Sequence, residues 1–94
     1  MAKRVRLGQS VFILDSFETG ITKATIEAIG KDYFVHSYCF NEFYTDEFRR
    51  PCYYDEENTR WFRKFKDALA YLRSKNPDCI LCQCDEDYWE IVID

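Results

Sequence analysis

Gly8-Gln9-Ser10-Val11-Phe12-Ile13-Leu14 opens the stretch that decides the fold of this chain. Its last four residues form an apolar run short enough to be a strand buried on both faces. From Ile21 to Ile29 apolar and polar residues alternate, which is typical of a half-buried strand. Gly30-Lys31-Asp32 then makes a hairpin loop before Tyr33–Tyr38, a run rich in strand-forming residues. The stretch predicts a small, strongly bent antiparallel sheet.

Two glycines are expected to provide the turns of this sheet. Gly20 closes the polar loop before the alternating strand and is suited to a positive φ, and Gly30 is available for a left-handed position in the hairpin loop. Within the strand, Ala24, Ile26 and Ala28 share one face because side chains alternate along an extended chain. We expect that face to point into the core.

The middle of the chain is harder to interpret. Residues 39–47 hold three aromatic side chains among acidic ones, which suits either an aromatic loop or a helical turn. We expect Phe48–Tyr54 and Thr59–Phe62 to form a strand pair around the acidic turn Asp55-Glu56-Glu57-Asn58. Pro51 has no N–H group for a ladder, so the first of these strands is predicted to lie at an edge or to be locally broken.

One helix and a closing hairpin follow. The segment Phe65–Lys75 carries a single apolar stripe at helical spacing, made by Phe65, Ala68, Leu69 and Leu72. Asn76-Pro77 should end this helix, because the residue before proline disfavours the helical conformation. Cys79–Cys84 and Tyr88–Ile93 flank an acidic turn and are expected to pair.

The chain has 94 residues, which bounds it to one domain, 1–94, too small to enclose a deep active site. Within it we expect barrel strands over 7–63, a helix over 65–75 and a hairpin over 79–93. Helical and strand periods predict a common core of Val11, Ile13, Ile26, Val35, Leu69 and Leu72. Eight Phe, seven Tyr and two Trp exceed what so small a core can bury, so some aromatic residues should lie on the surface and mark an interaction site.

Charge and cysteine usage bound the class of partner and the compartment. The formal net charge is −4, which argues against a general nucleic-acid binder. The basic Met1–Arg6 segment is not followed by the apolar region of an export signal, and no apolar run reaches the length of a membrane span. We therefore expect a cytoplasmic protein without a membrane partner, whose five cysteines are not paired as disulfides.

The order of strand, loop, hairpin, hairpin and helix, with Gly8 before the first strand, resembles the SH3-like barrels of the KOW type. It is also similar to small accessory proteins of Gram-positive bacteria and their phages or mobile elements. The matching segments are Gly8–Leu14, Ala24–Val35 and Trp61–Leu72. The resemblance implies an α+β fold, a strongly bent antiparallel sheet or SH3-like barrel with one packed helix and a C-terminal hairpin. It rests on structural positions and implies no catalytic residue.

The thiol cluster invites a zinc interpretation. Cys79 and Cys82 have the two-residue spacing that can chelate zinc, but the residues between them are apolar and no glycine provides a turn. On a strand, Cys82 and Cys84 share one face and Cys79 lies on the other. We expect these thiols to be small buried hydrophobes and predict no metal and no cofactor.

A catalytic pair is also conceivable at His36 and Cys39. Their three-residue offset puts the side chains on opposite faces of a regular strand, and no third residue is placed to orient the histidine. No phosphate-binding loop or nucleophile elbow occurs in the chain. We therefore predict that the protein is not an enzyme.

Two groups of charged residues are candidate binding surfaces. Basic and aromatic side chains form a strip suited to nucleic acid, made by Arg49, Arg50, Tyr53, Arg60, Trp61, Arg63 and Lys64. Carboxylates gather at turn tips, where they can imitate phosphates, at Asp46, Glu47, Asp55, Glu56, Glu57, Asp85, Glu86 and Asp87.

The net negative charge of the chain favours the carboxylates at the turn tips as the binding surface. We expect a non-enzymatic protein-binding module of a phage or mobile element that occupies a surface of a host protein, such as a nucleic-acid-processing effector. An inhibitor of a defence nuclease, for example an anti-CRISPR protein, is the most concrete form. The alternative is a KOW-like module that binds RNA or DNA through the basic–aromatic strip.

Overall fold

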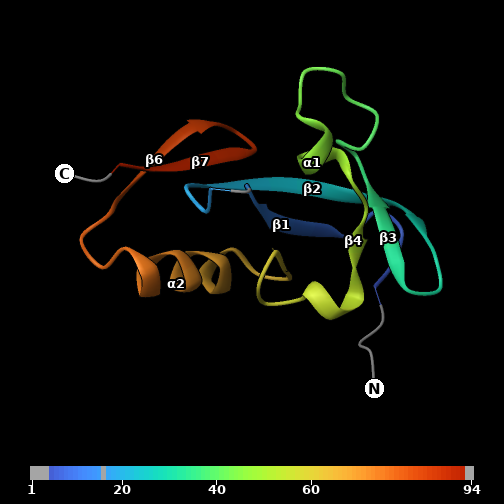
Figure 1. The fold of residues 1–94 in the computed structure, drawn as a ribbon, viewed down its shortest axis with the longest axis horizontal. Helices are drawn as coiled ribbons and strands as arrows, with labels where there is room; N and C mark the ends of the chain where they lie inside the picture. The colour runs from blue at the N-terminus through green and yellow to red at the C-terminus, as the bar shows by residue number, and fades with distance from the viewer. Residues whose placement is uncertain (1–4, 16, 93–94) are drawn as a thin grey trace.

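A strongly curled antiparallel sheet forms the centre of the protein, as seen in a computed structural model that describes residues 5–15 and 17–92 (Figure 1). Its strands are β1 (Ser10–Leu14), β2 (Gly20–Ile29), β3 (Tyr33–His36), β4 (Cys52–Tyr53), β5 (Trp61–Phe62), β6 (Ile80–Asp85) and β7 (Tyr88–Val92). The helical segments are α1 (Asp46–Arg49), the 3-10 turn η1 (Tyr54–Glu56) and α2 (Phe65–Lys75).

Strand β2 is the longest and organises the sheet. One of its edges pairs with β1, from Leu14 opposite Ile21 to Ser10 opposite Thr25. The other edge pairs with β7 near its start and with β3 near its end. β4 continues the sheet beyond β3, β5 continues it beyond β1, and β6 lies outside β7. The expected hairpin of β2 and β3 is confirmed, and the sheet bends along β2 into a half-barrel.

Both faces of the sheet are covered by hydrophobic side chains. The inside of the curl holds one buried cluster, made by Val5, Val11, Ile13, Ala24, Ile26, Phe34, Cys52 and Trp61. The outer face, which α2 covers, holds a second, made by Leu14, Ile21, Phe62, Ala68, Leu72, Cys79 and Ile91. Adjacent residues such as Trp61 and Phe62 enter different clusters because side chains alternate along a strand. The apolar β1 therefore faces hydrophobic residues on both sides, as its sequence predicts.

The expectation of one common core is wrong in part. Val11, Ile13 and Ile26 are buried in the inner cluster, whereas Leu72 is buried in the outer one, because α2 packs on the convex side of the sheet. Leu69 is half-buried against the outer cluster. Val35 is also only half-buried, since the register of β3 turns Phe34 and His36 inward.

The end of β2 departs from the predicted alternation. A register shift lies between Ile26 and Ala28 where β2 pairs with β3. Such a bulge places two residues opposite one and turns the following side chain to the other face. Ala28 is therefore exposed, whereas Ala24 and Ile26 are buried as expected.

The predicted strand pair of Phe48–Tyr54 with Thr59–Phe62 is wrong. β4 pairs with β3, and β5 pairs with β1, so the two segments lie at opposite ends of the path through the sheet. Phe48 belongs to α1, whose first turn is capped by the Thr45 hydroxyl, which accepts a hydrogen bond from the Phe48 N–H at 3.3 Å. β4 begins after Pro51 and is an edge strand, as the proline predicts.

The positive φ angles also differ from those expected. They occur at Glu18, Asn58 and Gly8, with φ of 56°, 70° and 80°, and not at Gly20 or Gly30. Gly20 has a different reason to lack a side chain. A Cβ there would lie 2.8 Å from the Tyr88 ring, so the aromatic ring occupies the space above this glycine.

The helix and the closing hairpin are confirmed. α2 spans Phe65–Lys75 without a side-chain cap at its start, and Asn76-Pro77 follows it. β6 and β7 pair as expected, although residue 93 of the predicted hairpin lies outside the described residues. Of the helices that the described ranges contain, none combines the length and the apolar character that crossing a bilayer requires.

Candidate functional site

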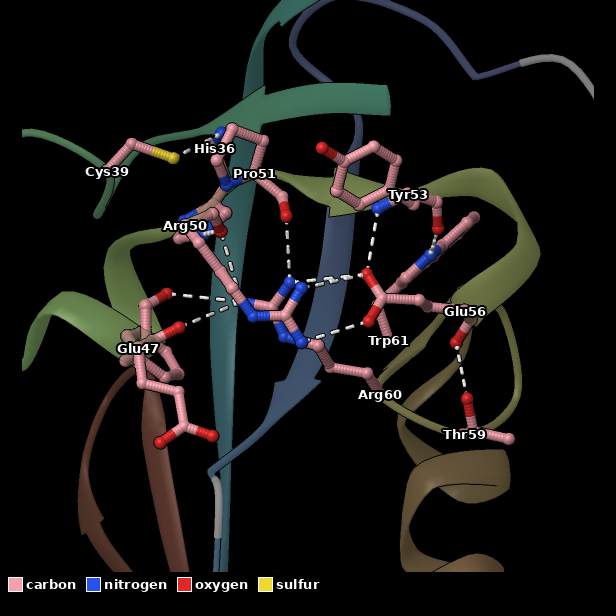
Figure 2. A network of polar contacts seen from close by, with 11 residues as sticks. His36, Cys39, Glu47, Arg50, Pro51, Tyr53, Glu56, Thr59, Arg60 and Trp61 are labelled. Atoms are coloured by element: carbon pink, nitrogen blue, oxygen red, sulfur yellow. Dashed lines mark hydrogen bonds and ion pairs between the residues drawn. The ribbon is translucent and has the colours of Figure 1, made fainter. Parts of the chain in front are cut away.

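Arg60 is the centre of a polar network that holds the segment before β4 against the turn before β5 (Figure 2). Its guanidinium donates to the carbonyl oxygens of Pro51 at 2.9 Å, Arg50 at 3.0 Å and Phe48 at 3.3 Å. The last carbonyls of a helix have no partner within the helix, so a guanidinium there satisfies them and complements the helix dipole. Arg60 therefore caps the C-terminal end of α1.

Glu56 connects this network to β4. It receives a two-pronged ion pair from Arg50, with N–O distances of 3.0 and 3.3 Å, and a hydrogen bond from the Tyr53 N–H at 3.0 Å. Burial alone raises the pKa of Glu56, but these hydrogen bonds and the charges of Arg50 and Arg60 outweigh it, so the pKa lies below its ordinary value. Glu56 is a structural carboxylate.

Trp61 and Arg63 also contribute to packing. The Trp61 side chain has 0 % exposure, and its indole N–H donates to the Tyr53 carbonyl at 2.8 Å. Arg63 lies over the Trp61 ring, 5.4 Å from its centroid, and donates to the Glu57 carboxylate at 2.7 Å. A buried indole offers no face for a nucleobase, so this part of the expected basic–aromatic strip supports the fold.

The other members of that strip belong to different elements, namely α1, β4 and the start of α2. Arg49 donates to the Cys39 carbonyl at 3.2 Å and lies 3.5 Å from the carboxylate of Asp46. Lys64 is exposed just before α2. Tyr53 is exposed on the edge strand, 5.8 Å from the ring of Tyr33. Most cations of the strip are therefore engaged in ion pairs, with Asp46, Glu56 or Glu57.

The acidic residues likewise divide into separate groups. Glu56 and Glu57 are paired with arginines, whereas Asp55 is exposed beside them. Asp46 and Glu47 begin α1, and Asp46 faces Arg49. The turn Asp85-Glu86-Asp87 is exposed at the end of the β6–β7 hairpin, and the Lys23 N–H donates to the Asp87 carbonyl at 2.8 Å. This turn lies on the same side of β2 as α1 (Figure 1).

His36 is buried, and its surroundings favour the neutral imidazole. The Tyr38 N–H donates to Nδ1 at 3.2 Å, so Nε2 carries the proton and donates to the Arg50 carbonyl at 3.2 Å. Burial lowers the pKa of His36 to about 4, with a smaller contribution from the charge of Arg60. The Cys39 thiol accepts a hydrogen bond from the His36 backbone N–H at 3.4 Å.

The five thiols lie at different depths. Cys52 and Cys79 are buried, Cys39 is half-buried, and Cys82 and Cys84 are exposed on β6. The expectation that Cys82 and Cys84 are buried is therefore wrong, because β6 is the outermost strand of the hairpin. Within the described ranges, no three His, Cys, Asp or Glu side chains are grouped closely enough to hold a metal ion.

An aromatic groove, which sequence reasoning did not assign, runs between the β1–β2 loop, the segment before α1 and the start of β7. Its volume is about 280 Å³, and it is lined by Asp15, Phe17, Thr22, Phe43, Tyr44, Thr45, Phe48 and Tyr88. Phe17 and Phe43 are 84 % and 96 % exposed, respectively. Large apolar side chains exposed together on a small protein are typical of an interaction site.

One wall of the aromatic groove is a packed group of rings. Tyr44 lies 4.8 Å from Tyr38 and 5.1 Å from Phe48, and the Tyr44 and Phe48 rings are stacked. Tyr88, whose ring lies over Gly20, lines the same groove. Because these rings contact one another and the sheet, the wall is formed before any ligand arrives.

The aromatic groove is acidic. Asp15 is the only charged residue among its described lining residues. Tyr88 has a raised pKa because of burial and the nearby carboxylates of Glu90 and Asp15. Burial, with the neighbouring Tyr44 and the carboxylates of Asp87 and Asp85, raises the pKa of Tyr38 to about 12. The predicted acidic turn therefore lies close enough to act on the ring wall.

The sequence contained one signal for this site, namely more aromatic residues than a small core can hold. It did not show which of them are exposed, because the lining residues come from four separate segments. No family model, no curated protein and no solved structure matches the chain.

Proposed function

We propose that the protein is a non-enzymatic protein-binding module and that the aromatic groove with its acidic surroundings is its binding surface. The observation that carries the proposal is the exposure of Phe17 and Phe43 on one groove that contains Asp15. Interfaces draw most of their binding energy from a few large side chains, and charges around them guide the approach of the partner.

The strand order supports the finer assignment to an SH3-like barrel. A long bent β2 is shared by two halves of the sheet, β1 pairs with β5, and a 3-10 turn connects β4 to β5. The β6–β7 hairpin is an addition to that barrel, and it contributes Tyr88 to the groove. We infer that this addition adapts a barrel to a particular partner.

The partner is proposed to be a basic surface of a host protein in the cytoplasm. The chain has a net charge of −4 and an exposed Asp85-Glu86-Asp87 turn. These negative charges are complementary to a basic surface of the partner that normally binds phosphates. In its most concrete form, the module belongs to a phage or mobile element and blocks a nucleic-acid-processing effector such as a defence nuclease, as anti-CRISPR proteins do.

The test begins with capture of partners by the tagged protein from cells of the native host, identified by mass spectrometry. Replacing both Phe17 and Phe43 by Ala should abolish capture of the specific partner. The variant Asp85→Lys/Glu86→Lys/Asp87→Lys should bind the purified partner with a slower association rate, since charges at the rim affect encounter more than dissociation.

Matched charge changes elsewhere provide the control. Glu27, Asp32 and Asp78 are exposed acids outside the groove, and reversing all three to Lys should leave the association rate nearer to that of the wild type. Equal capture by the wild type and the Phe17→Ala/Phe43→Ala variant would contradict the proposed surface.

Binding of nucleic acid remains the competing function, and it has less support. Trp61 is buried, while Arg50, Arg60 and Arg63 are engaged with Glu56 or Glu57. Arg50 and Arg60 are unsuitable for a charge-reversal test because both hold the fold together, so exposed Lys64 and Lys66 should be changed to Glu instead. Tight oligonucleotide binding that falls steeply with salt and is lost in that variant would favour the alternative.

A further inference from the structure

We propose that the aromatic groove takes the guanidinium group of an arginine side chain presented by the partner. This inference deepens the proposed function and rests on it for the identity of the partner as a protein. The groove has the three properties that such a group requires: aromatic faces, a carboxylate and a volume suited to one side chain with its flanking backbone.

The aromatic faces favour a weakly hydrated cation. Phe17 and Phe43 are almost fully exposed, and Tyr88 and the stacked Tyr44–Phe48 pair lie on the same groove. A cation over an aromatic ring is attracted by the negative face of the ring. A guanidinium is flat and loses less hydration than an ammonium, so arginine stacks on such rings better than lysine does.

Asp15 is held in place and can still accept hydrogen bonds. Its Oδ1 accepts from the Thr19 N–H at 2.7 Å, and its Oδ2 accepts from the Thr19 hydroxyl at 2.8 Å. An ionised carboxylate has about four lone-pair sites, so these two contacts leave capacity for a guanidinium. The loop is further held by Glu18, which lies 3.4 Å from Lys75 of α2. A fixed carboxylate costs a ligand less to engage than a mobile one.

The charge around the groove agrees with this ligand. Among the described residues that line it, none is basic, and the carboxylates of Asp85 and Asp87 act on Tyr38 in the ring wall. An anionic ligand would be repelled by these carboxylates. A purely apolar ligand would lie against Asp15 without donating a hydrogen bond to it. A cation flanked by apolar atoms therefore fits both parts of the groove.

The isolated protein can be tested with a defined probe, an acetylated and amidated pentapeptide with arginine between two pairs of glycines. The matched peptides carry citrulline, which is the neutral isostere of arginine, or lysine. Binding is followed through the backbone amide NMR shifts of ¹⁵N-labelled protein. We expect saturable shifts at Phe17, Phe43, Tyr44 and Tyr88 with the arginine peptide, and binding about tenfold weaker with citrulline.

Two variants of equal charge complete the design. Asp15→Asn keeps an oxygen for the Thr19 N–H and should weaken arginine binding about tenfold. Asp78→Asn removes one charge at an exposed site outside the groove and should bind like the wild type. Equal binding of the arginine and citrulline peptides, or equal loss in both variants, would overturn the proposal.

The outcome separates this inference from the proposed function. If the host partner is captured through Phe17 and Phe43 but the arginine peptide gives no shifts in the groove, the binding surface stands and the guanidinium assignment is overturned. If the arginine peptide binds as described while no partner is captured, the guanidinium site is supported and the proposed function fails.

Discussion

We expected the segments on either side of η1 to be joined by strand pairing. The side chain of Arg60 joins them instead. Its fork reaches four backbone carbonyls and approaches Glu56 at 3.5 Å, while its side chain is only 13 % exposed. A planar guanidinium can donate in several fixed directions at once, which an ammonium cannot do. The sequence showed a basic residue near an aromatic one, but not that carbonyl oxygens would surround it.

We predict that Arg60→Lys destabilises the protein. Lysine keeps the charge but loses the fork, so two or more carbonyls at the end of α1 lose their donor, at a cost of about 1–3 kcal/mol. Urea denaturation should show the change in the free energy of unfolding. Arg73→Lys, at an exposed position of α2, is the control and should remain within about 0.5 kcal/mol of the wild type. Equal stability of the two variants would contradict a capping role for Arg60.

His36 predicts a pH dependence of stability. Its pKa is about 4 in the folded protein, against 6.5 for an ordinary histidine. Between these values the unfolded chain binds the proton more readily, so stability is full above pH 6.5 and falls as the pH falls toward 4. The expected slope is about 1.4 kcal/mol per pH unit, or about 3 kcal/mol in total.

Denaturation of the wild type and of His36→Phe between about pH 5 and 7 measures this slope. The phenylalanine variant loses two hydrogen bonds and has lower absolute stability, so the slopes are compared rather than the values. The free energy of unfolding of this variant should depend less steeply on pH, and the difference in slope should correspond to one titrating proton. Parallel slopes would show that His36 is not the titrating group.

At the scale of elements, the helix and the local hairpins were predictable, whereas the pairings between distant strands were not. The apolar stripe predicted α2 because its apolar residues recur at helical spacing within a single element. The β2–β3 and β6–β7 hairpins followed from local turns. β4 and β5 each contain two residues and pair with strands far away in the sequence, so no local period revealed their partners.

The docking of α2 predicts different costs for two leucines on one helix. Leu72 has 0 % exposure in the outer cluster, whereas Leu69 is half-buried. Leu72→Ala should destabilise the protein by about 2–5 kcal/mol, and Leu69→Ala by less, since fewer contacts are removed. Thermal or urea denaturation of the two variants checks the order. A larger loss at Leu69 would mean that α2 packs with a different face.

At the scale of the whole molecule, thiol chemistry reports how the layers are arranged. Cys82 and Cys84 should react with iodoacetamide in the native protein, while Cys52 and Cys79 stay protected because they are buried. Burial also raises the pKa of Cys52 to about 12, which leaves almost no reactive thiolate. Peptide mapping by mass spectrometry gives the extent of labelling at each site.

All five cysteines should react once the protein is unfolded in denaturant, which is the control for this measurement. Labelling of Cys52 at the rate of Cys82 in the native protein would contradict the inner cluster as described.

The candidate site belongs to the whole molecule, and for this reason the sequence could not assign it. Asp15, Phe43 and Tyr88 come from a loop, a turn segment and a strand, and only the curled sheet brings them together. The expected charged residues were visible as runs, yet Glu56 and Glu57 proved to be engaged with arginines. Composition predicted surface aromatic residues, but their positions required the tertiary structure.

The pairing of β7 with β2 has a consequence for the order of folding. Gly20 and its ladder partner Glu90 are separated by most of the chain, so closing this pair costs more chain entropy than closing the local hairpins. The barrel strands can associate before β7 is added, and Tyr88 takes its place above Gly20 only in that late step. We therefore expect the aromatic groove to be completed only after the other strands have paired.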